Sequence, residues 1–357
     1  MTDFDIPHRR LHNQHLAGTL FEKPDEVVRW LGAVQAQEYA GAKWALAQRA
    51  QDQTAAAIDR AFAAGAILRT HVMRPTWHFV APEDIRWLLE LTAPRVKAVS
   101  AYYFRKLGLD AAVFARCQAA LVKALRGGKT LTRSELESVL RKAGLAQETD
   151  DRLRLAYIMI QAELDGVICS GALRGKQHTY ALLEERAPPV KALPRDEALA
   201  ELARRFFTSH GPATVKDYTW WSGLTTADAR AGLEMVKPRL AEEVVDGKSF
   251  WFAPEAPAPR AASPTAHLLP AYDEYTIAYK DRTAVLDPQY LQQVVAGNGI
   301  VIVVDGRIVG TWKRTFQQGT VVLALRPFTR LTKAEDQAVA AAAARYGAFL
   351  GLPVVLA

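Results

Sequence analysis

The chain of 357 residues contains only two cysteines, Cys117 and Cys169. They are too few for a disulfide framework or a multi-cysteine zinc site, and a reducing cytoplasm is the expected location. The first residues lack the apolar core of a signal peptide. The most apolar tract, 338–357, is interrupted by Arg345 and Pro353. A packed helix followed by a strand is therefore expected there, and not a membrane span.

The composition is that of an ordinary globular protein. Half of the residues are hydrophobic and 23% are charged, which argues against disorder. The formal charge is +7 and the isoelectric point about 9.3. This moderate excess of positive charge is compatible with a polyanionic partner and does not by itself establish one.

One arrangement, helices followed by two short β-rich runs, recurs along the chain. In the clearest copy a helix-periodic run begins near Asp110, and Thr132 with Glu135 forms the pattern of a capping box at the next helix. A third helical run starts near 152, and strand-like runs surround 172–176. Three helices followed by a hairpin is the order of a winged helix.

Two further copies lie on either side, and the sequence predicts an α+β fold with three tandem winged-helix units and a small C-terminal β-rich domain. The third copy ends on two strands around Asp246 and Gly247, and the first has paired strands that turn near Arg74. A linker rich in proline and alanine spans 253–264. The predicted domains are 1–107 (winged helix 1, core 5–90, with a helical connector), 108–190 (winged helix 2, core 108–188), 195–255 (winged helix 3) and 264–357 (β-rich, with a final helix).

Basic residues gather on three of the four predicted hairpins. Between Asp165 and Glu184 the only charges are Arg174 and Lys176, and between Asp305 and Glu335 there are six basic residues and no acid. Hairpins of this kind can contact phosphates, although basic hairpin tips are also common without a partner. We expect the units to enclose a concave basic groove. The candidate DNA-binding residues are Lys43, Arg69, Arg74, His78, Arg174, Lys176, Arg307, Lys313 and Arg314.

The run VQAQEYAGAKW at 34–44 places two neutral amides, Gln35 and Gln37, in an apolar setting. Residues two apart on a helix point about 200° from each other, so both can serve one site only where a helix ends or the chain turns. Gly41 is a plausible helix end. The plain alternative is that one glutamine caps a helix and the other is exposed.

Four segments together resemble the AlkZ-type DNA glycosylases, a bacterial family of tandem winged-helix proteins. They are VQAQ, RTHVMRPTWHFV, LLPAYDEYTIAYKDR and VVDGRIVGTWKR, in this order over nearly the whole chain. The resemblance implies excision of bulky alkylated purines and unhooking of DNA crosslinks, without a metal or organic cofactor. It maps the catalytic Gln-x-Gln motif onto Gln35 and Gln37.

The chemistry makes amides plausible in this role. A purine alkylated at N7 carries positive charge and leaves without a general acid, so a glutamine carbonyl that positions water and faces the developing sugar cation is sufficient. Glu38 is the rival general base. We therefore expect a monomeric DNA glycosylase that acts on alkylated purines of the N7-alkylguanine type in double-stranded DNA, in the cytoplasm and associated with the nucleoid when bound. The alternative is a non-catalytic winged-helix DNA-binding protein or transcriptional regulator.

Other candidate residues have simpler explanations. His8, His12 and His15 have helical spacing, but no cysteine or carboxylate pair completes a metal site, and a polar helix is expected. Asp273 and Glu274 lie in a strand-like run, where neighbours face opposite ways and do not form an acid/base dyad; one of them is expected to anchor a basic residue. Trp220 and Trp221 are interpreted as core of the third winged helix.

Overall fold

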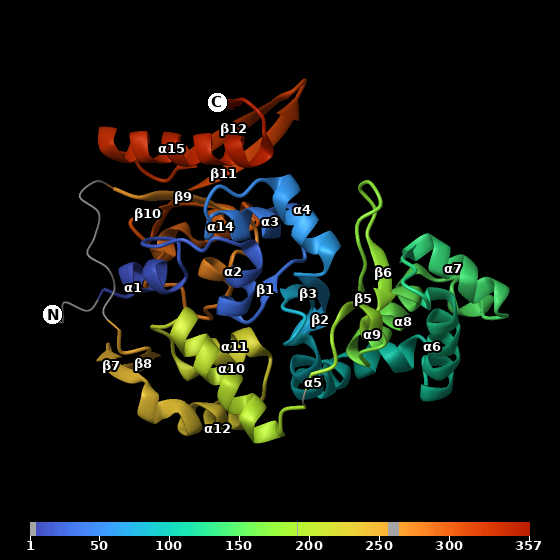
Figure 1. Cartoon of the computed structure of the whole chain (residues 1–357). Helices are drawn as coiled ribbons and strands as arrows, with labels where there is room; N and C mark the ends of the chain where they lie inside the picture. The colour runs from blue at the N-terminus through green and yellow to red at the C-terminus, as the bar shows by residue number, and fades with distance from the viewer. Residues whose placement is uncertain (1–4, 191, 256–263) are drawn as a thin grey trace. The chain divides into compact units, whose positions relative to one another are not determined.

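The computed structural model describes residues 5–190, 192–255 and 264–357 (Figure 1). The chain forms two compact units. The first unit comprises Met1–Ile58, Ala200–Trp221 and Thr225–Ala357, and the second comprises Asp59–Leu199 and Ser222–Leu224. The division into four consecutive domains stays a prediction, and most of the predicted linker at 253–264 lies outside the described residues.

The N-terminal third of the chain contains helices followed by paired strands, as the sequence predicts, and also an unpredicted short strand and helix at 34–47. The elements are α1 Ile6–Asn13, α2 Pro24–Leu31, β1 Val34–Gln35, α3 Tyr39–Ala47, α4 Ala55–Ala64, β2 Leu68–Val72, β3 Arg74–Val80 and α5 Ile85–Lys106. Strands β2 and β3 form an antiparallel hairpin in which Val72 pairs with Arg74 across Met73, which has a positive φ of 63°. The turn therefore lies one residue before the predicted position.

The middle of the chain contains the three longer helices and the strand pair that the sequence predicts, together with shorter elements. The elements are α6 Ala111–Leu125, β4 Leu131–Thr132, α7 Arg133–Lys142, η1 Ala146–Glu148, α8 Arg152–Leu164, β5 Ile168–Ser170, β6 Thr179–Leu182 and α9 Leu183–Arg186. Thr132 and Glu135 form the capping box of α7. Leucines of α6 and α7 pack with Ile158 and Met159 of α8 into one buried cluster. This arrangement is compatible with a winged helix.

A further set of helices ends on the hairpin around Asp246. The elements are α10 Arg195–Ser209, α11 Val215–Ser222, α12 Thr226–Val236, η2 Lys237–Arg239, β7 Ala241–Val245 and β8 Lys248–Phe252. Asp246 and Gly247 have φ of 49° and 72°, as a two-residue hairpin turn requires. Trp221 is fully buried as predicted, but Trp220 is 40% exposed, so the interpretation of both tryptophans as core is wrong for Trp220.

The C-terminal part is a five-stranded sheet covered by a helix (Figure 1). Its elements are β9 Ala266–Leu269, α13 Glu274–Ile277, η3 Pro288–Tyr290, α14 Leu291–Ala296, β10 Val301–Val304, β11 Arg307–Gln317, β12 Thr320–Pro327, α15 Lys333–Leu350 and β13 Val354–Leu356. The strand order is β13-β12-β11-β10-β9, with only the β12–β13 pair parallel. Helix α15 packs on β9, β10 and β13. The α+β class and the C-terminal sheet are thus confirmed.

Two predicted features are corrected by the structure. The helix before the glutamines ends at Gly32, which has a φ of 79°, and Gly41 lies in the first turn of the following helix. Asp273 is the N-cap of the short helix α13, not a strand residue, because its carboxylate accepts a hydrogen bond from the Tyr275 amide at 2.9 Å.

Neither a membrane-spanning helix nor a metal-binding cluster is found among the described residues. Among them, no helix is long and apolar enough to cross a membrane. No group of three His, Cys, Asp or Glu side chains in the same residues is arranged to hold a metal ion. His8 and His12 lie on α1, and His15 follows it.

Candidate functional site

The two glutamines lie on the non-helical segment between α2 and α3. Gln35 belongs to the two-residue strand β1 and is 6% exposed, whereas Gln37 is exposed in a bend. On a helix, the two glutamine side chains would point about 200° apart and could not serve one site. This segment is not helical, so that restriction does not apply. The sequence required a helix to end near the two glutamines, and α2 ends before Gln35.

A buried glutamate from a distant part of the chain holds this segment. Oε1 of Glu274 accepts a hydrogen bond of 2.7 Å from the backbone amide of Gln35. Its Oε2 accepts one of 2.8 Å from Nε1 of Trp221 and lies 3.4 Å from Nε2 of His210. Glu274 is fully buried. Since both oxygens have donors, the carboxyl group fixes the backbone at Gln35 against the core of the first unit.

The neighbouring acid, Asp273, anchors an arginine, as one of this pair was expected to do. Its two oxygens accept from Nη1 and Nη2 of Arg49 at 2.9 and 2.8 Å, and both residues are buried. Arg49 also donates to the backbone and side-chain oxygens of Gln14 at 3.0 and 2.9 Å. A buried ion pair with every partner satisfied rigidifies its surroundings. Asp273 and Glu274 therefore have separate structural partners and do not act as a dyad.

Glu38 begins the helix that follows the glutamines. Its carboxylate accepts a hydrogen bond of 2.6 Å from the backbone amide of Gly41, as an N-cap does. The same carboxylate lies 3.5 Å from the Arg314 guanidinium, which also donates to the Tyr346 hydroxyl at 2.6 Å. A Cβ added to Gly41 would lie 2.5 Å from the Glu38 carboxylate. A side chain at Gly41 would therefore displace the Glu38 carboxylate from its present position.

The predicted DNA-binding residues fall into two groups by exposure. Arg174, Lys176, Arg307 and Lys313 are exposed, and Arg74 and Arg314 are partly exposed. Lys43, Arg69 and His78 are buried. Arg174 pairs with Glu135 at 2.6 Å but keeps half of its side chain in solvent.

The buried members of the set have contacts inside the protein. The Arg69 guanidinium lies 4.2 Å from the centroid of the Trp77 ring. His78 interacts through Nδ1 with the Thr76 carbonyl at 2.9 Å and through Nε2 with Arg74 at 3.4 Å. His78 is therefore buried and hydrogen-bonded within the hairpin, and its assignment as a DNA-binding residue stays a prediction.

The sequence did not predict the supporting contacts that three residues make at this site. The Glu274 carboxylate accepts from the Gln35 amide and from the Trp221 indole. The Tyr346 hydroxyl accepts from the Arg314 guanidinium. Each of these contacts joins parts of the chain that are far apart in sequence, and no local pattern marks them. The only local signal was the presence of two adjacent acids in an otherwise apolar run.

Comparison with known proteins agrees with the resemblance carried by the four motifs. A Streptomyces sahachiroi protein described as an interstrand DNA cross-link repair glycosylase is 28% identical over 97% of this chain and 96% of its own length. The solved structure of the Streptomyces sahachiroi DNA glycosylase AlkZ matches with a TM-score of 0.81 and 24% identity, covering 99% of this chain and 98% of that one. The model of the DNA glycosylase AlkZ-like family matches residues 28–349, and this chain is a member of that family.

Proposed function

We propose that this protein excises alkylated purines, of the N7-alkylguanine type, from double-stranded DNA as a monomeric glycosylase. Bulky adducts and crosslinks are included, because the Streptomyces relative is described as a cross-link repair glycosylase. The observation that carries the proposal is the position of Gln37. It is exposed on a short non-helical segment, and the buried Glu274 fixes that segment two residues earlier.

The proposed roles of the two amides follow from the charge of the substrate. A purine alkylated at N7 is already cationic, so its glycosidic bond breaks without protonation of the base. The carbonyl oxygen of Gln37 accepts a hydrogen bond from the attacking water and faces the developing sugar cation. Gln35 supports the same site from the anchored backbone. Water adds to the sugar carbon and loses a proton to solvent, the bond to the base breaks, and the base leaves as a neutral molecule with the bonding electron pair.

Glu38 is the weaker candidate for the base. Its carboxylate already caps α3 through the Gly41 amide and lies near the Arg314 guanidinium. Both contacts hold the carboxylate in a structural role at the start of α3. We assign Glu38 the task of fixing the chain directly after Gln37.

DNA binding is assigned to the exposed basic residues. Lys313 lies on β11, whose long pairing with β12 extends to Gln317 and Thr320. Phe316, near the end of the same hairpin, is 58% exposed. Lys176 and Arg307 add exposed positive charge near two other turns. Lys43, Arg69 and His78 support the fold in this proposal and do not contact phosphate directly.

The second candidate function is a non-catalytic DNA-binding protein or regulator. Helical units that end in hairpins are the observation that favours it, because winged helices commonly serve transcription factors. Such regulators are usually dimers that read spaced half-sites, whereas this chain carries three candidate units of its own and no evident coiled-coil heptads. We therefore rank it second.

Incubation with a duplex oligonucleotide that contains one N7-methylguanine separates the two functions. Alkaline cleavage of the resulting abasic site reports excision, and the same duplex with unmodified guanine is the control. If the protein is a glycosylase, alkali cleaves only the methylated strand, at the abasic site that excision leaves. Binding of both duplexes with no excision would favour the regulator, provided that crosslinked DNA is bound without excision as well.

A further inference from the structure

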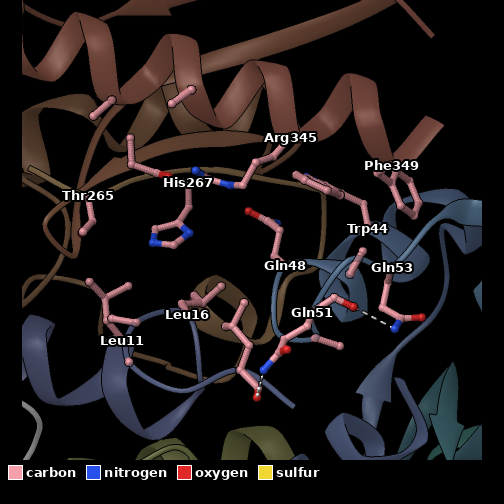
Figure 2. A pocket seen from close by; sticks show the side chains of 18 of the residues that line it. Leu11, Leu16, Trp44, Gln48, Gln51, Gln53, Thr265, His267, Arg345 and Phe349 are labelled. Atoms are coloured by element: carbon pink, nitrogen blue, oxygen red, sulfur yellow. Dashed lines mark hydrogen bonds between the residues drawn. The ribbon is translucent and has the colours of Figure 1, made fainter. Parts of the chain in front are cut away.

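A cavity of about 970 Å³ lies within the first unit, bounded by α1, α3, β9 and α15. It is lined mainly by apolar side chains, among them Leu11, Leu16, Trp44 and Phe349 (Figure 2). Neither Gln35 nor Gln37 lines it. Its size is at the upper end of the range found for pockets that bind small molecules. The cavity is thus separate from the proposed catalytic segment.

Two buried polar side chains point into this cavity, as Figure 2 shows for Gln48 and His267. Gln48 is 8% exposed and His267 is 6% exposed. Neither Nε2 nor Oε1 of Gln48, nor Nε2 of His267, has a hydrogen-bond partner among the described residues. Buried polar atoms in native proteins are nearly always hydrogen-bonded, so these three require a partner from outside the chain.

The two polar side chains that point into the cavity are uncharged. Burial and the nearby Arg345 and Arg49 guanidinium groups lower the pKa of His267 to about 3, so its ring is uncharged at neutral pH. Gln48 carries no charge. Arg345, which donates to the Ala266 carbonyl at 2.6 Å and is partly in solvent, also lines the cavity. A ligand is therefore expected to present an uncharged end to Gln48.

We propose that this cavity is a second binding site that takes a flat, largely apolar heteroaromatic molecule with an uncharged donor–acceptor edge. The Gln48 amide offers one donor and one acceptor side by side, which is the complement of a lactam. His267 offers one further hydrogen bond to the same molecule. Trp44 and Phe349, whose rings lie 5.1 Å apart between centroids, provide an aromatic wall. The site does not depend on excision.

Three probes of similar size and shape test the chemistry by calorimetry on the full chain. Quinolin-2(1H)-one has the lactam edge, naphthalene has no polar edge, and 2-naphthoate carries a charge. Two neutral hydrogen bonds correspond to about 10-fold to 100-fold in affinity, so quinolin-2(1H)-one should exceed naphthalene by that factor. Tighter binding of 2-naphthoate would overturn the neutral assignment, and no binding of any probe would overturn the site.

Gln48→Met keeps the size of the side chain and removes the amide. It should make quinolin-2(1H)-one bind no better than naphthalene, with an unchanged or higher melting temperature because an unsatisfied polar group is removed. Gln293→Leu, an exposed glutamine of α14 outside the cavity, is the matched control and should leave binding unchanged. A large fall in melting temperature for Gln48→Met would show that water or the chain satisfies the amide, and would refute the proposal.

Discussion

Replacing Glu274 by glutamine tests whether the buried anchor positions the catalytic segment. The wild-type carboxyl group accepts from the Gln35 amide through one oxygen and from the Trp221 indole through the other. Glutamine retains one oxygen, so one of these two donors must face an NH₂ group. Leaving a buried donor unsatisfied costs about 1–3 kcal/mol. We expect Glu274→Gln to be destabilised by about 2 kcal/mol, by the same principle.

The effect on excision should be larger than the loss of stability alone produces. If the Gln35 backbone moves by about 1 Å, the rate falls by about 100-fold, since a displacement of that size disturbs the reactive geometry. Single-turnover excision at 25 °C with enzyme in excess measures the chemical step on protein that circular dichroism shows to be folded. DNA affinity should change little.

Trp221→Phe is the matched control for this experiment. It removes the other donor to Glu274 and leaves the bond to the Gln35 amide in place. We expect a lower melting temperature and excision near the wild-type rate. The reasoning is refuted if folded Glu274→Gln excises as fast as the wild type, or if Trp221→Phe loses as much activity as Glu274→Gln.

Three further predictions concern binding, capping and pH. Lys313→Ala should weaken duplex binding across sequences. In a salt titration, the slope of log affinity against log salt should fall in magnitude by about 0.9, which corresponds to the loss of one phosphate contact. An unchanged slope would exclude that contact. Gly41→Ala should lower the melting temperature, because the new Cβ displaces the Glu38 cap; an unchanged melting temperature would show that the cap can shift. His267 has a lowered pKa when folded, so the unfolded chain binds its proton more readily, and stability should fall as pH drops from about 6.5 towards 3. In His267→Leu, the free energy of unfolding measured with urea should change less with pH between about 6.5 and 3. The same pH dependence as in the wild type would contradict the lowered pKa of His267.

Local chemistry was predictable from the sequence, because short-range signals decide it. The Thr132–Glu135 capping box and the Asp246–Gly247 turn appear where their residue types require them. The strands predicted beyond residue 264 likewise form the C-terminal sheet. Gly41 was misinterpreted as a helix end because a glycine has several uses, and the close approach of Glu38 is visible only in three dimensions.

The support of the site was not predictable, because it depends on contacts between distant residues. Gln35 and Glu274 are 239 positions apart, and Arg49 and Asp273 are 224 apart. The same limit applies to the basic residues. Arg69 and His78 have the charge or polarity of a phosphate ligand, and only the packing of the hairpin shows that they are buried.

The most direct test of the proposed function compares wild type with Gln37→Ala on duplex DNA that contains N7-methylguanine. Loss of one contact made mainly in the transition state costs on the order of 3–4 kcal/mol, or about 10²–10³-fold in rate, and leaves binding nearly intact. Gln35→Ala should lower the rate of excision, and Gln37→Asp should keep part of the wild-type rate. We predict that Gln37→Ala binds the duplex like the wild type and that its excision is abolished or falls by at least that factor. Excision by Gln37→Ala at the wild-type rate would contradict the catalytic role of the glutamines.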